Sequence, residues 1–519
     1  MTKTRDLADL GGGFIQAGTG AQQRTVESKL QDVVSVKDFG AVGDGVTDDT
    51  VAIQAAIDSL DPFPIRPGNG TIFFPSGTYF VSNEIDVRGE NVCLKGESVE
   101  STIILRSDAG AAGAIIRLSA NGTEPVSTTC YRNSIIDLTL KHSTPATANE
   151  GIRADAQYDL RIQNVEIINP YIGIQAKSCI YTFDNIFVNY EDDAYLTSTI
   201  GYASFLWARN GSGATDFTPT AGSGIVNNCR ALKRAAGQPQ PTQYNFLINS
   251  ADGIWMTNCY ARGASKDNFS LFPGDEFSRV SGVLATALWS DWANEAGLRV
   301  SNDFGGNCRN NSFSMMRVYG GNSGTLNTDY GIVIGDNAGL GDVYSTSIVA
   351  CKINNTLFEG IRVEANTKET HITQPEVFNA SFGSINTYNS VLIRPNASYW
   401  SIIGGAVDSD GAGGTSRAIR GIQVGAGCSD YVIQGVQTLR CQTTQGILDP
   451  NLIQNKLVSI PGRPTRGVRP SAYTSTQLTD GTYPATAAWL GESVYVSDSL
   501  KLAYSDGTNW RYFDTSLSV

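Results

Sequence analysis

The stretch Val34-Ser-Val-Lys-Asp-Phe-Gly-Ala-Val-Gly-Asp-Gly-Val-Thr-Asp-Asp-Thr-Val-Ala-Ile-Gln-Ala-Ala-Ile57 decides the fold of this chain. It predicts a short strand, a glycine turn and then an amphipathic helix. Thr47 is the expected N-cap of the helix, and Asp48 and Asp49 would place negative charge on its first turn, where the helix dipole favours it. Its apolar side is predicted from two i,i+4 pairs, Val51 with Ala55 and Ile53 with Ile57. A helix this short needs a larger apolar surface to cover.

Residues 22–80 also resemble a known family. The segment VSVKDFGAVGDG resembles the beginning of pectate-lyase-like right-handed parallel β-helices, in which a short helix closes the open end of the solenoid. Together with the preceding Arg24-Thr-Val-Glu-Ser-Lys-Leu-Gln-Asp32, it resembles the junction of bacteriophage tailspikes more than that of secreted plant-wall enzymes. The resemblance implies an all-β chain, namely a right-handed parallel β-helix with a short N-terminal capping helix and a small C-terminal β module.

The composition agrees with a solenoid that is rich in turns. The chain has 519 residues, of which 55 are glycine and only 17% are charged, so it is too long for one compact core and too poor in charge for long exposed helices. The net charge of −12 and the lack of a basic cluster argue against a nucleic-acid partner. No apolar run is long enough for membrane insertion, and the acids near the N-terminus do not suit a signal peptide, so we expect folding in the host cytoplasm.

Metal sites and disulfides are not expected. The nine cysteines include no C-x-x-C pair, and the chain has only two histidines, His142 and His371. The sequence therefore predicts no zinc site and no other cofactor, and a reducing compartment disfavours disulfides.

From about residue 160 a short pattern repeats: apolar, any, Asn or another small or polar residue, apolar, any, apolar. Ile162-Gln-Asn-Val-Glu-Ile167 and Phe183-Asp-Asn-Ile-Phe-Val188 are two copies. Consecutive copies are 21 to 30 residues apart except across the intervals 185–228 and 282–350, which is typical of a β-solenoid with insertions. The expected central residues are Asn164, Asn185, Asn228, Asn258, Gly282, Ala350, Gln374, Gly404 and Gln434.

This register predicts two columns of side chains. Cys229, Cys259 and Cys351 each follow a central residue, so they should fill the interior of the rungs as small apolar groups. The central asparagines should stack as a polar ladder, which is a structural role.

The pattern also sets the predicted domain boundaries. Residues 1–33 are expected to form a neck for virion attachment, 34–460 the capped β-helix, and 461–519 a linker and the C-terminal β module. The intervals 185–228 and 282–350 are too long for one rung, and such excursions often carry function on repeat scaffolds.

Two carboxylates have the same predicted offset. Asp267 and Asp291 each lie nine residues after a central residue, and neighbouring strands are about 4.8 Å apart. The sequence therefore predicts that they stack on one outer face, with the separation of about 5 Å that retaining glycosidases use. Their repulsion would raise one pKa and provide a protonated acid near neutral pH. Glu295 and Glu359 are further catalytic candidates, and Glu359 has the same offset from Ala350.

Three residues are candidates for substrate binding. Trp289 and Trp292 flank Asp291, and indole rings are good platforms for sugar rings, although core or trimer packing is the simpler explanation. Arg262 precedes Asp267 and could bind the carboxylate of an acidic sugar. An exposed carboxylate in a turn is often only a solvated residue, so the acidic pair also has a purely structural explanation.

One short motif does not indicate a polygalacturonase. Asn327-Thr-Asp329 mimics a polygalacturonase motif, but neither histidine is flanked by the glycines of the second motif that this family needs.

The resemblance implies a homotrimeric phage tailspike in the virion, joined to the tail or an adaptor protein through its N-terminus. Such proteins bind and depolymerise bacterial surface polysaccharide (capsule, exopolysaccharide or O-antigen) during host cell adhesion. We predict an endo-glycoside hydrolase with paired carboxylates. Three alternatives remain: a polysaccharide lyase that acts by β-elimination, a non-catalytic receptor-binding spike, and a purely structural virion trimer.

Overall fold

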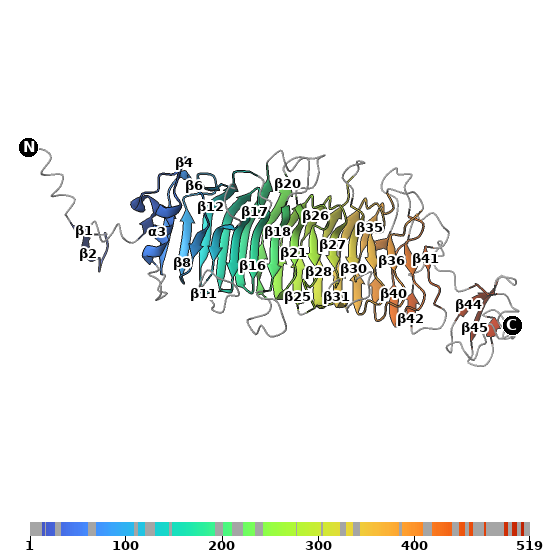
Figure 1. Ribbon diagram of the computed structural model, residues 1–519. Coiled ribbons are helices and arrows are strands. Elements are labelled where there is room, and N and C mark those ends of the chain that lie inside the picture. Colours follow the sequence, from blue (N-terminus) through green and yellow to red (C-terminus); the bar gives the residue numbers. More distant parts are fainter. Residues whose placement is uncertain are drawn as a thin grey trace, which may run out of the picture. The chain divides into compact units, whose positions relative to one another are not determined.

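The computed structural model divides the chain into two compact units, Met1–Trp289 (unit 1) and Ser290–Val519 (unit 2). Within each unit, parallel strands stack rung upon rung into a β-helix (Figure 1). The described residues are 13–15, 17–25, 33–60, 69–107, 113–119, 130–144, 148–191, 201–209, 222–233, 242–276, 278–302, 305–321, 328–335, 343–382, 387–407, 418–438, 446–451, 456–459, 472–473, 493–496, 501–505 and 510–512.

One sheet of unit 1 takes one strand from each rung in chain order. Its strands are β7 (Ile85–Val87), β10 (Ala114–Leu118), β13 (Glu150–Asp155), β16 (Ile172–Lys177), β18 (Gly201–Ala208), β21 (Thr242–Ile248) and β24 (Phe269–Leu271). Phe205, Phe246 and Phe269 occupy one interior column, with successive ring centroids 4.6 and 4.9 Å apart. This aromatic column lies in the core of the unit.

One sheet of unit 2 is built in the same way. Its strands are β27 (Ala296–Val300), β30 (Tyr330–Ile334), β33 (Ile361–Val363), β36 (Val391–Ile393), β39 (Ile422–Val424) and β41 (Ile447–Leu448). Ile332, Ile361 and Val391 are paired in register and fully buried, so the interior column here is aliphatic.

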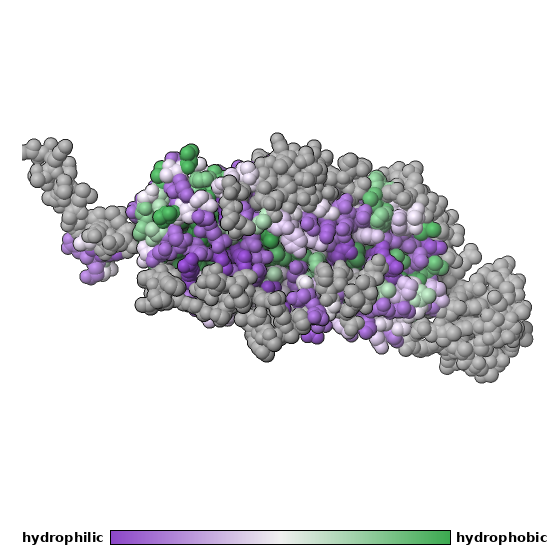
Figure 2. Space-filling model, in the orientation of Figure 1, coloured by the Kyte–Doolittle hydropathy of each residue, from purple (hydrophilic) through white to green (hydrophobic). Residues whose placement is uncertain are grey.

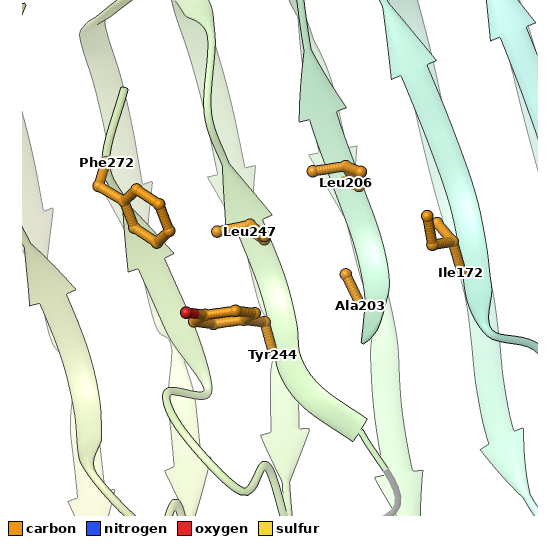
Figure 3. Packing of buried hydrophobic residues seen from close by; sticks show 6 residues of the cluster. All are labelled: Ile172, Ala203, Leu206, Tyr244, Leu247 and Phe272. Carbon is orange, nitrogen blue, oxygen red and sulfur yellow. The ribbon is translucent and has the colours of Figure 1, made fainter. Parts of the chain in front are cut away.

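The outer face of the unit 1 sheet is apolar over part of its length. Figure 3 shows side chains of one buried cluster, carried by β16, β18 and β21 and by a residue that follows β24. Leu206 and Leu247 belong to it, and each lies next in the chain to a phenylalanine of the interior column, so they point outward. The other members are Ile172, Ala203, Tyr244 and Phe272.

The rung corners are residues with left-handed backbone. Asn164, Asn185, Asn228 and Asn258 have φ between 51° and 53°, a region that asparagine tolerates better than most residues. The predicted ladder is confirmed for the first two, because the Asn185 amide donates to Asn164 Oδ1 at 2.8 Å. Asn228 donates instead to Asp184 Oδ1 at 3.4 Å. These asparagines therefore serve backbone conformation as well as stacking.

The predicted interior cysteines are confirmed. Cys229, Cys259 and Cys351 are at most 1% exposed, and burial raises the pKa of Cys351 to about 12. All the cysteines that the structure describes are free thiols, and these three act as small apolar core groups.

The predicted register is wrong at Gly282, whereas the predicted corners Ala350, Gln374 and Gly404 have the expected positive φ. Thr257 pairs with Thr286, so the next corner is Ala287, with a φ of 54°, and not Gly282. Gly282 lies inside a strand, opposite Gly253 of the preceding rung, where both glycines have positive φ.

A smaller slip occurs at the last predicted corner. Ile403 pairs with Gln434, so the residue that stacks on Gly404 is Gly435, and Gly435 has the positive φ of 69°. Gln434 is therefore the last residue of its strand and not a corner.

The capping helix is present, but it begins later than predicted. Helix α3 spans Thr50–Leu60, and Asp44–Asp48 form the strand β4. Thr47 is not an N-cap, because the Asp44 carboxylate accepts from the N–H groups of Val46 and Thr47 at 2.9 and 2.7 Å and fixes a local turn. The Asp49 carboxylate also does not cap the helix.

Asp49 binds the glycine turn instead. Its carboxylate accepts from the N–H groups of Val42 and Gly43 at 2.6 and 3.0 Å. The predicted apolar side of α3 is confirmed at Ile53 and Ile57, which are buried.

The prediction is wrong at Val51, which is 80% exposed. The helix contacts β5 (Gly70–Phe74) and β7, and Figure 2 shows hydrophobic residues gathered on the surface at this end of unit 1.

Smaller sheets occur near both termini. β1 (Gly13–Ile15) pairs with β2 (Gln23–Thr25), and residues 461–470, the predicted linker, lie outside the described residues. No helix in the described part of the chain is long and apolar enough to cross a membrane. The C-terminal sheet contains β43 (Ala472–Tyr473), β44 (Ser493–Val496), β45 (Lys501–Ser505) and β46 (Trp510–Tyr512).

Candidate functional site

A six-residue motif occurs once in each unit on the sheets described above. Glu150-Gly-Ile-Arg-Ala-Asp155 forms β13, and Glu359-Gly-Ile-Arg-Val-Glu364 contains β33. A Cβ at Gly151 or Gly360 would collide with a core side chain of the facing strand, so both glycines allow a close approach in the interior. The arginine of each motif follows a fully buried isoleucine, Ile152 or Ile361, and the acid precedes the inward glycine, so both lie on the outer face.

In unit 2, three carboxyl groups lie where successive strands begin. Glu295 precedes β27, Asp329 precedes β30 and Glu359 precedes β33. The Tyr330 N–H donates to the Glu295 carbonyl at 2.8 Å, and the Gly331 N–H donates to the Glu359 carbonyl at 3.3 Å. Because neighbouring parallel strands are about 4.8 Å apart, the three residues form one group on adjacent rungs, which we call the carboxylate cluster.

Asp329 has a strongly perturbed ionisation. Partial burial and the neighbouring Glu295 carboxylate raise the pKa of Asp329 to about 6, against the opposing effect of Arg299. Arg299 is engaged by the other acid, because its Nη2 lies 3.0 Å from Glu295 Oε2. Asp329 can therefore hold a proton beside a carboxylate that is ion-paired.

Glu359 is buried on the next rung. It is 4% exposed, and burial raises its pKa against the opposing effect of Arg362. Its Oε2 atom accepts no hydrogen bond from a described residue, and the same holds for Oδ1 of the buried Asn389 one rung further on. Buried acceptors without donors are rare and cost free energy. A ligand with several hydroxyl groups would supply the donors.

Arg362 and three aromatic rings complete this face. The arginine Nη1 donates to the Tyr330 hydroxyl at 2.9 Å, its guanidinium lies 5.0 Å from the centroid of that ring, and its Nε lies 2.6 Å from Glu364. The ring of Phe358 packs between Tyr330 and Tyr388, at centroid distances of 5.3 and 4.6 Å.

This combination suits the cleavage of a glycosidic bond. A carboxylic acid and a carboxylate about 5 Å apart can act as proton donor and nucleophile, and a wider pair can activate water instead. Aromatic rings provide flat apolar surfaces for sugar rings, and arginine binds carboxylates in two-point contacts. Among the residues that the structure describes, no group of three or more His, Cys, Asp or Glu side chains is placed to hold a metal ion.

Three of the residues predicted for the site lie in unit 1. Asp267 directly precedes Asn268 and β24, is 2% exposed and accepts from Ser270 Oγ at 3.1 Å. Arg262 ends β23 (Tyr260–Arg262) and is half-buried. Trp289 is 46% exposed, and its ring centroid lies 5.6 Å from that of Tyr260.

The equal offset predicted for the acidic pair is wrong. Asp267 lies nine residues after the corner Asn258, but Asp291 lies four residues after the corner Ala287. Asp291 is half-buried at the end of β26 (Trp289–Asp291). The catalytic roles of the two aspartates remain predictions.

Trp292 has a left-handed backbone with a φ of 52°, and its N–H donates to the Tyr319 carbonyl at 3.0 Å. It is half-buried in unit 2, and a role in substrate binding remains a prediction.

The structure places two of the sequence candidates, Glu295 and Glu359, where strands β27 and β33 begin, with Asp329 on the rung between them. Asp329 was not predicted as a site residue, because its local sequence resembles only an incomplete polygalacturonase motif. A second repeat in the sequence could have indicated Asp329. Glycine followed by Ile or Leu recurs at Gly297, Gly331 and Gly360, and each of these glycines comes two residues or less after a member of the cluster.

Parts of the chain resemble known sequences. Residues 33–215 match the family described as rhamnogalacturonase A/epimerase, pectate lyase-like. The chain is 36% identical to alginate lyase 7 of Azotobacter vinelandii over 150 residues, which cover 26% of this chain and 16% of that protein. It is 27% identical to the tail spike protein of Shigella phage Sf6 over 193 residues, which cover 36% and 27%. The chain thus spans less than a third of the length of either relative.

Solved structures have the same fold. The tailspike protein of E. coli bacteriophage HK620 in complex with a pentasaccharide matches with a TM-score of 0.58 and 14% identity, over 88% of this chain and 84% of that one. Tailspike protein 3 of bacteriophage CBA120 matches with a TM-score of 0.57 and 14% identity, over 100% and 75%. The chain therefore has the right-handed parallel β-helix fold, as predicted. The proteins that it resembles in sequence or in fold include phage tailspikes and an alginate lyase.

Proposed function

We propose that this chain is a homotrimeric phage tailspike that binds bacterial surface polysaccharide and hydrolyses it at the carboxylate cluster of unit 2. One observation carries the proposal: Asp329, with its pKa raised to about 6, lies on the rung next to the ion-paired Glu295. Similarity to one tailspike sequence, and to the fold of a tailspike solved with a pentasaccharide, supports the class of ligand. Attachment to the phage tail or an adaptor protein through the N-terminus is part of the proposal.

In the proposed reaction, Asp329 donates its proton to the glycosidic oxygen as the bond to the anomeric carbon breaks. Glu295 either attacks that carbon or directs a water molecule to it, depending on the separation that the bound sugar imposes. In the first case, the Asp329 carboxylate then removes a proton from the water that releases the sugar from Glu295. Glu359 and Asn389 accept hydrogen bonds from sugar hydroxyls.

A polysaccharide lyase is the second candidate, and the similarity to alginate lyase 7 favours it. β-Elimination requires a uronic acid with a neutralised carboxylate and a base for its C5 proton. Arg299 and Arg362 meet the first requirement. Burial raises the pKa of Tyr330, however, which makes this tyrosine a poor base. We therefore favour hydrolysis.

The test is release of oligosaccharides from polysaccharides isolated from candidate host bacteria. The full-length chain should generate new reducing ends, whereas a lyase would generate unsaturated products with a new ultraviolet absorption. Saturable binding without fragment release would contradict both reactions and leave a receptor-binding spike.

Variants locate the site within the same assay. Glu295→Gln should abolish release, while Glu376→Gln should not, because Glu376 is an exposed glutamate of the same unit that pairs with Lys352 at 3.1 Å. Asp267→Asn and Asp291→Asn test the pair predicted from the sequence. If both of these variants are inactive while Glu295→Gln is active, the chemistry does not occur at the carboxylate cluster.

A further inference from the structure

Unit 1 contains its own group of polar side chains on the outer face of β10, β13 and β16. Parallel pairing places Arg117 beside Arg153, and Arg153 beside Gln175, in one outward column. Asp155 and Lys177 are paired in the next outward column, and Glu150 begins the motif. We call these six residues the polar array.

The arginines of the polar array form ion pairs with acids. Both arginines approach the same oxygen of Asp155: Arg153 Nε lies 3.1 Å and Arg117 Nε lies 3.8 Å from Oδ2. Arg117 also lies 3.6 Å from Glu84. Asp155 is fully buried, but the arginine side chains remain 14% and 22% exposed, so the array is open at its rim.

Three acceptor atoms of the array are buried and accept no hydrogen bond from any residue that the structure describes. They are Asp155 Oδ1, Gln175 Oε1 and Glu150 Oε2. Asp155 and Gln175 are 0% and 9% exposed as whole residues. Such atoms are uncommon in native proteins because each loses hydrogen bonds to water without replacement. The site therefore requires donors.

The charges around these acceptors define the kind of donor. A metal cation is disfavoured because two guanidinium groups already lie against Asp155, and an anion is disfavoured by the three acceptor atoms. A neutral molecule with several hydroxyl groups fits, since each hydroxyl can donate to the acceptors and accept from Arg153 or Lys177.

An aromatic surface borders the polar array. The Tyr171 N–H donates to the carbonyl of Asn149, the residue before Glu150, at 3.1 Å. The ring of Tyr171 stacks on that of Tyr202, with centroids 6.1 Å apart, and both rings pack against the apolar cluster of Figure 3. Both tyrosines are only partly buried, so a flat apolar surface continues from the polar acceptors.

We propose that the polar array binds one neutral sugar residue, a hexose or deoxyhexose, of the polysaccharide. Its hydroxyl groups donate to Asp155, Gln175 and Glu150, and its apolar face lies on Tyr171. The ligand class rests on the proposed function, but this site in unit 1 binds sugar and does not cleave it.

Saturation-transfer NMR on the full-length chain tests the proposal with D-glucose, D-galactose, D-mannose and L-rhamnose, each offered alone. At least one sugar should receive saturation from the protein. Gln175→Met should weaken that binding about fivefold, the loss of roughly one hydrogen bond. Gln163→Met is the matched control on β15 (Leu160–Ile168), outside the array, and should bind like the wild type.

Folding is checked by thermal melting of each variant. Gln175→Met removes an acceptor that has no donor, so it should not lower the melting temperature. Tyr171→Ala, at a partly exposed position, is an independent variant that should also weaken binding, whereas Tyr171→Phe should retain it.

The proposal is overturned if none of the four sugars receives saturation, or if Gln175→Met and Tyr171→Ala bind like the wild type. It is also overturned if binding is lost in Glu295→Gln but kept in Gln175→Met, because the sugar then lies at the carboxylate cluster. Absence of oligosaccharide release together with sugar binding that depends on Gln175 contradicts only the proposed hydrolysis, so the two failures are distinguishable.

Discussion

The motif Glu-Gly-Ile-Arg occupies residues 150–153 in unit 1 and 359–362 in unit 2, in two different electrostatic settings. In both, the arginine Nε lies within 3.1 Å of the acid two residues later, Asp155 or Glu364. The local sequence thus produces the same strand start, the same inward-facing glycine and the same ion pair in both units. The difference between the two sites must come from the rungs on either side.

Those neighbouring rungs differ in charge. Burial raises the pKa of Glu150 to about 7, but Lys177 and Arg117 oppose the shift and two arginines approach Asp155. In unit 2 a second carboxyl group, Asp329, lies on the rung before Glu359, and the largest effect of a neighbouring charge on its pKa comes from another acid, Glu295. Under the two proposals, the polar array of unit 1 binds the polysaccharide, while the carboxylate cluster of unit 2, with its adjacent carboxyl groups, cleaves it.

The largest expected effect is on kcat, which distinguishes a residue that takes part in cleavage from one that only binds. Asp329→Asn should lower kcat for oligosaccharide release by about 100-fold or more, because the proton donor is lost. Glu150→Gln should leave kcat unchanged and alter KM at most. Initial rates of reducing-end formation measure both. A large fall in kcat for Glu150→Gln would reverse the assignment of the two sites.

The next effect tests whether the two motifs are equivalent in their packing. Gly151→Ala and Gly360→Ala each force a Cβ against core atoms and should each lower stability by about 1–3 kcal/mol. Thermal unfolding of the two single variants measures this. A fall in melting temperature for only one of them would show that the second motif tolerates the methyl group and that the equivalence is incomplete.

A smaller effect concerns pH. Because the pKa of Asp329 rises from 3.8 to about 6 on folding, the native state holds an extra proton between these values. Stability from this group is therefore lost as the pH rises through this window. Asp329→Asn should remove that loss, so the variant gains in melting temperature over the wild type towards pH 6. Parallel melting curves for the two proteins across the window would contradict the raised pKa.

The smallest effect concerns the corners. Unit 1 uses asparagine at Asn228 and Asn258, whereas unit 2 has Met315 and Ala350 in the same left-handed backbone, each with a φ of 51°. Ala350→Asn should stabilise the chain by up to about 1 kcal/mol, because asparagine tolerates this backbone better than alanine. Asn228→Ala should destabilise it to a similar extent. Thermal melting would contradict this account if the two substitutions shifted stability in the same direction.

The fold could be predicted because its strongest signals are local. The glycine turn, the apolar positions Ile53 and Ile57, and the interior cysteines each follow from short-range spacing. The start of α3 could not be predicted, because the Asp44 carboxylate accepts from the N–H and the hydroxyl of Thr47 and holds this residue in a turn before the helix. That turn leaves no distinct sequence pattern. The corner at Ala287 was missed because alanine rarely adopts positive φ and Gly282 fitted the pattern better.

The candidate site was predicted only in part for a related reason. Glu295 and Glu359 were selected from the sequence, but the role of Asp329 depends on which carboxyl groups meet across rungs. A five-residue error at one corner moved the expected partner of Asp267 to Asp291. Spacing along the chain predicts the rungs well, but it does not predict contacts between them once insertions of unequal length intervene.

The hydrogen bonds of Asp49 have a consequence for how the molecule comes apart. A stack of rungs has free ends, and local unfolding of such a stack starts there because a terminal rung has only one neighbour. Asp49 joins the beginning of α3 to the N–H groups of Val42 and Gly43 in the turn before it. We therefore expect this one carboxylate to limit fraying at the N-terminal end of unit 1, and with it the exposure of this end to proteases and to hydrogen exchange.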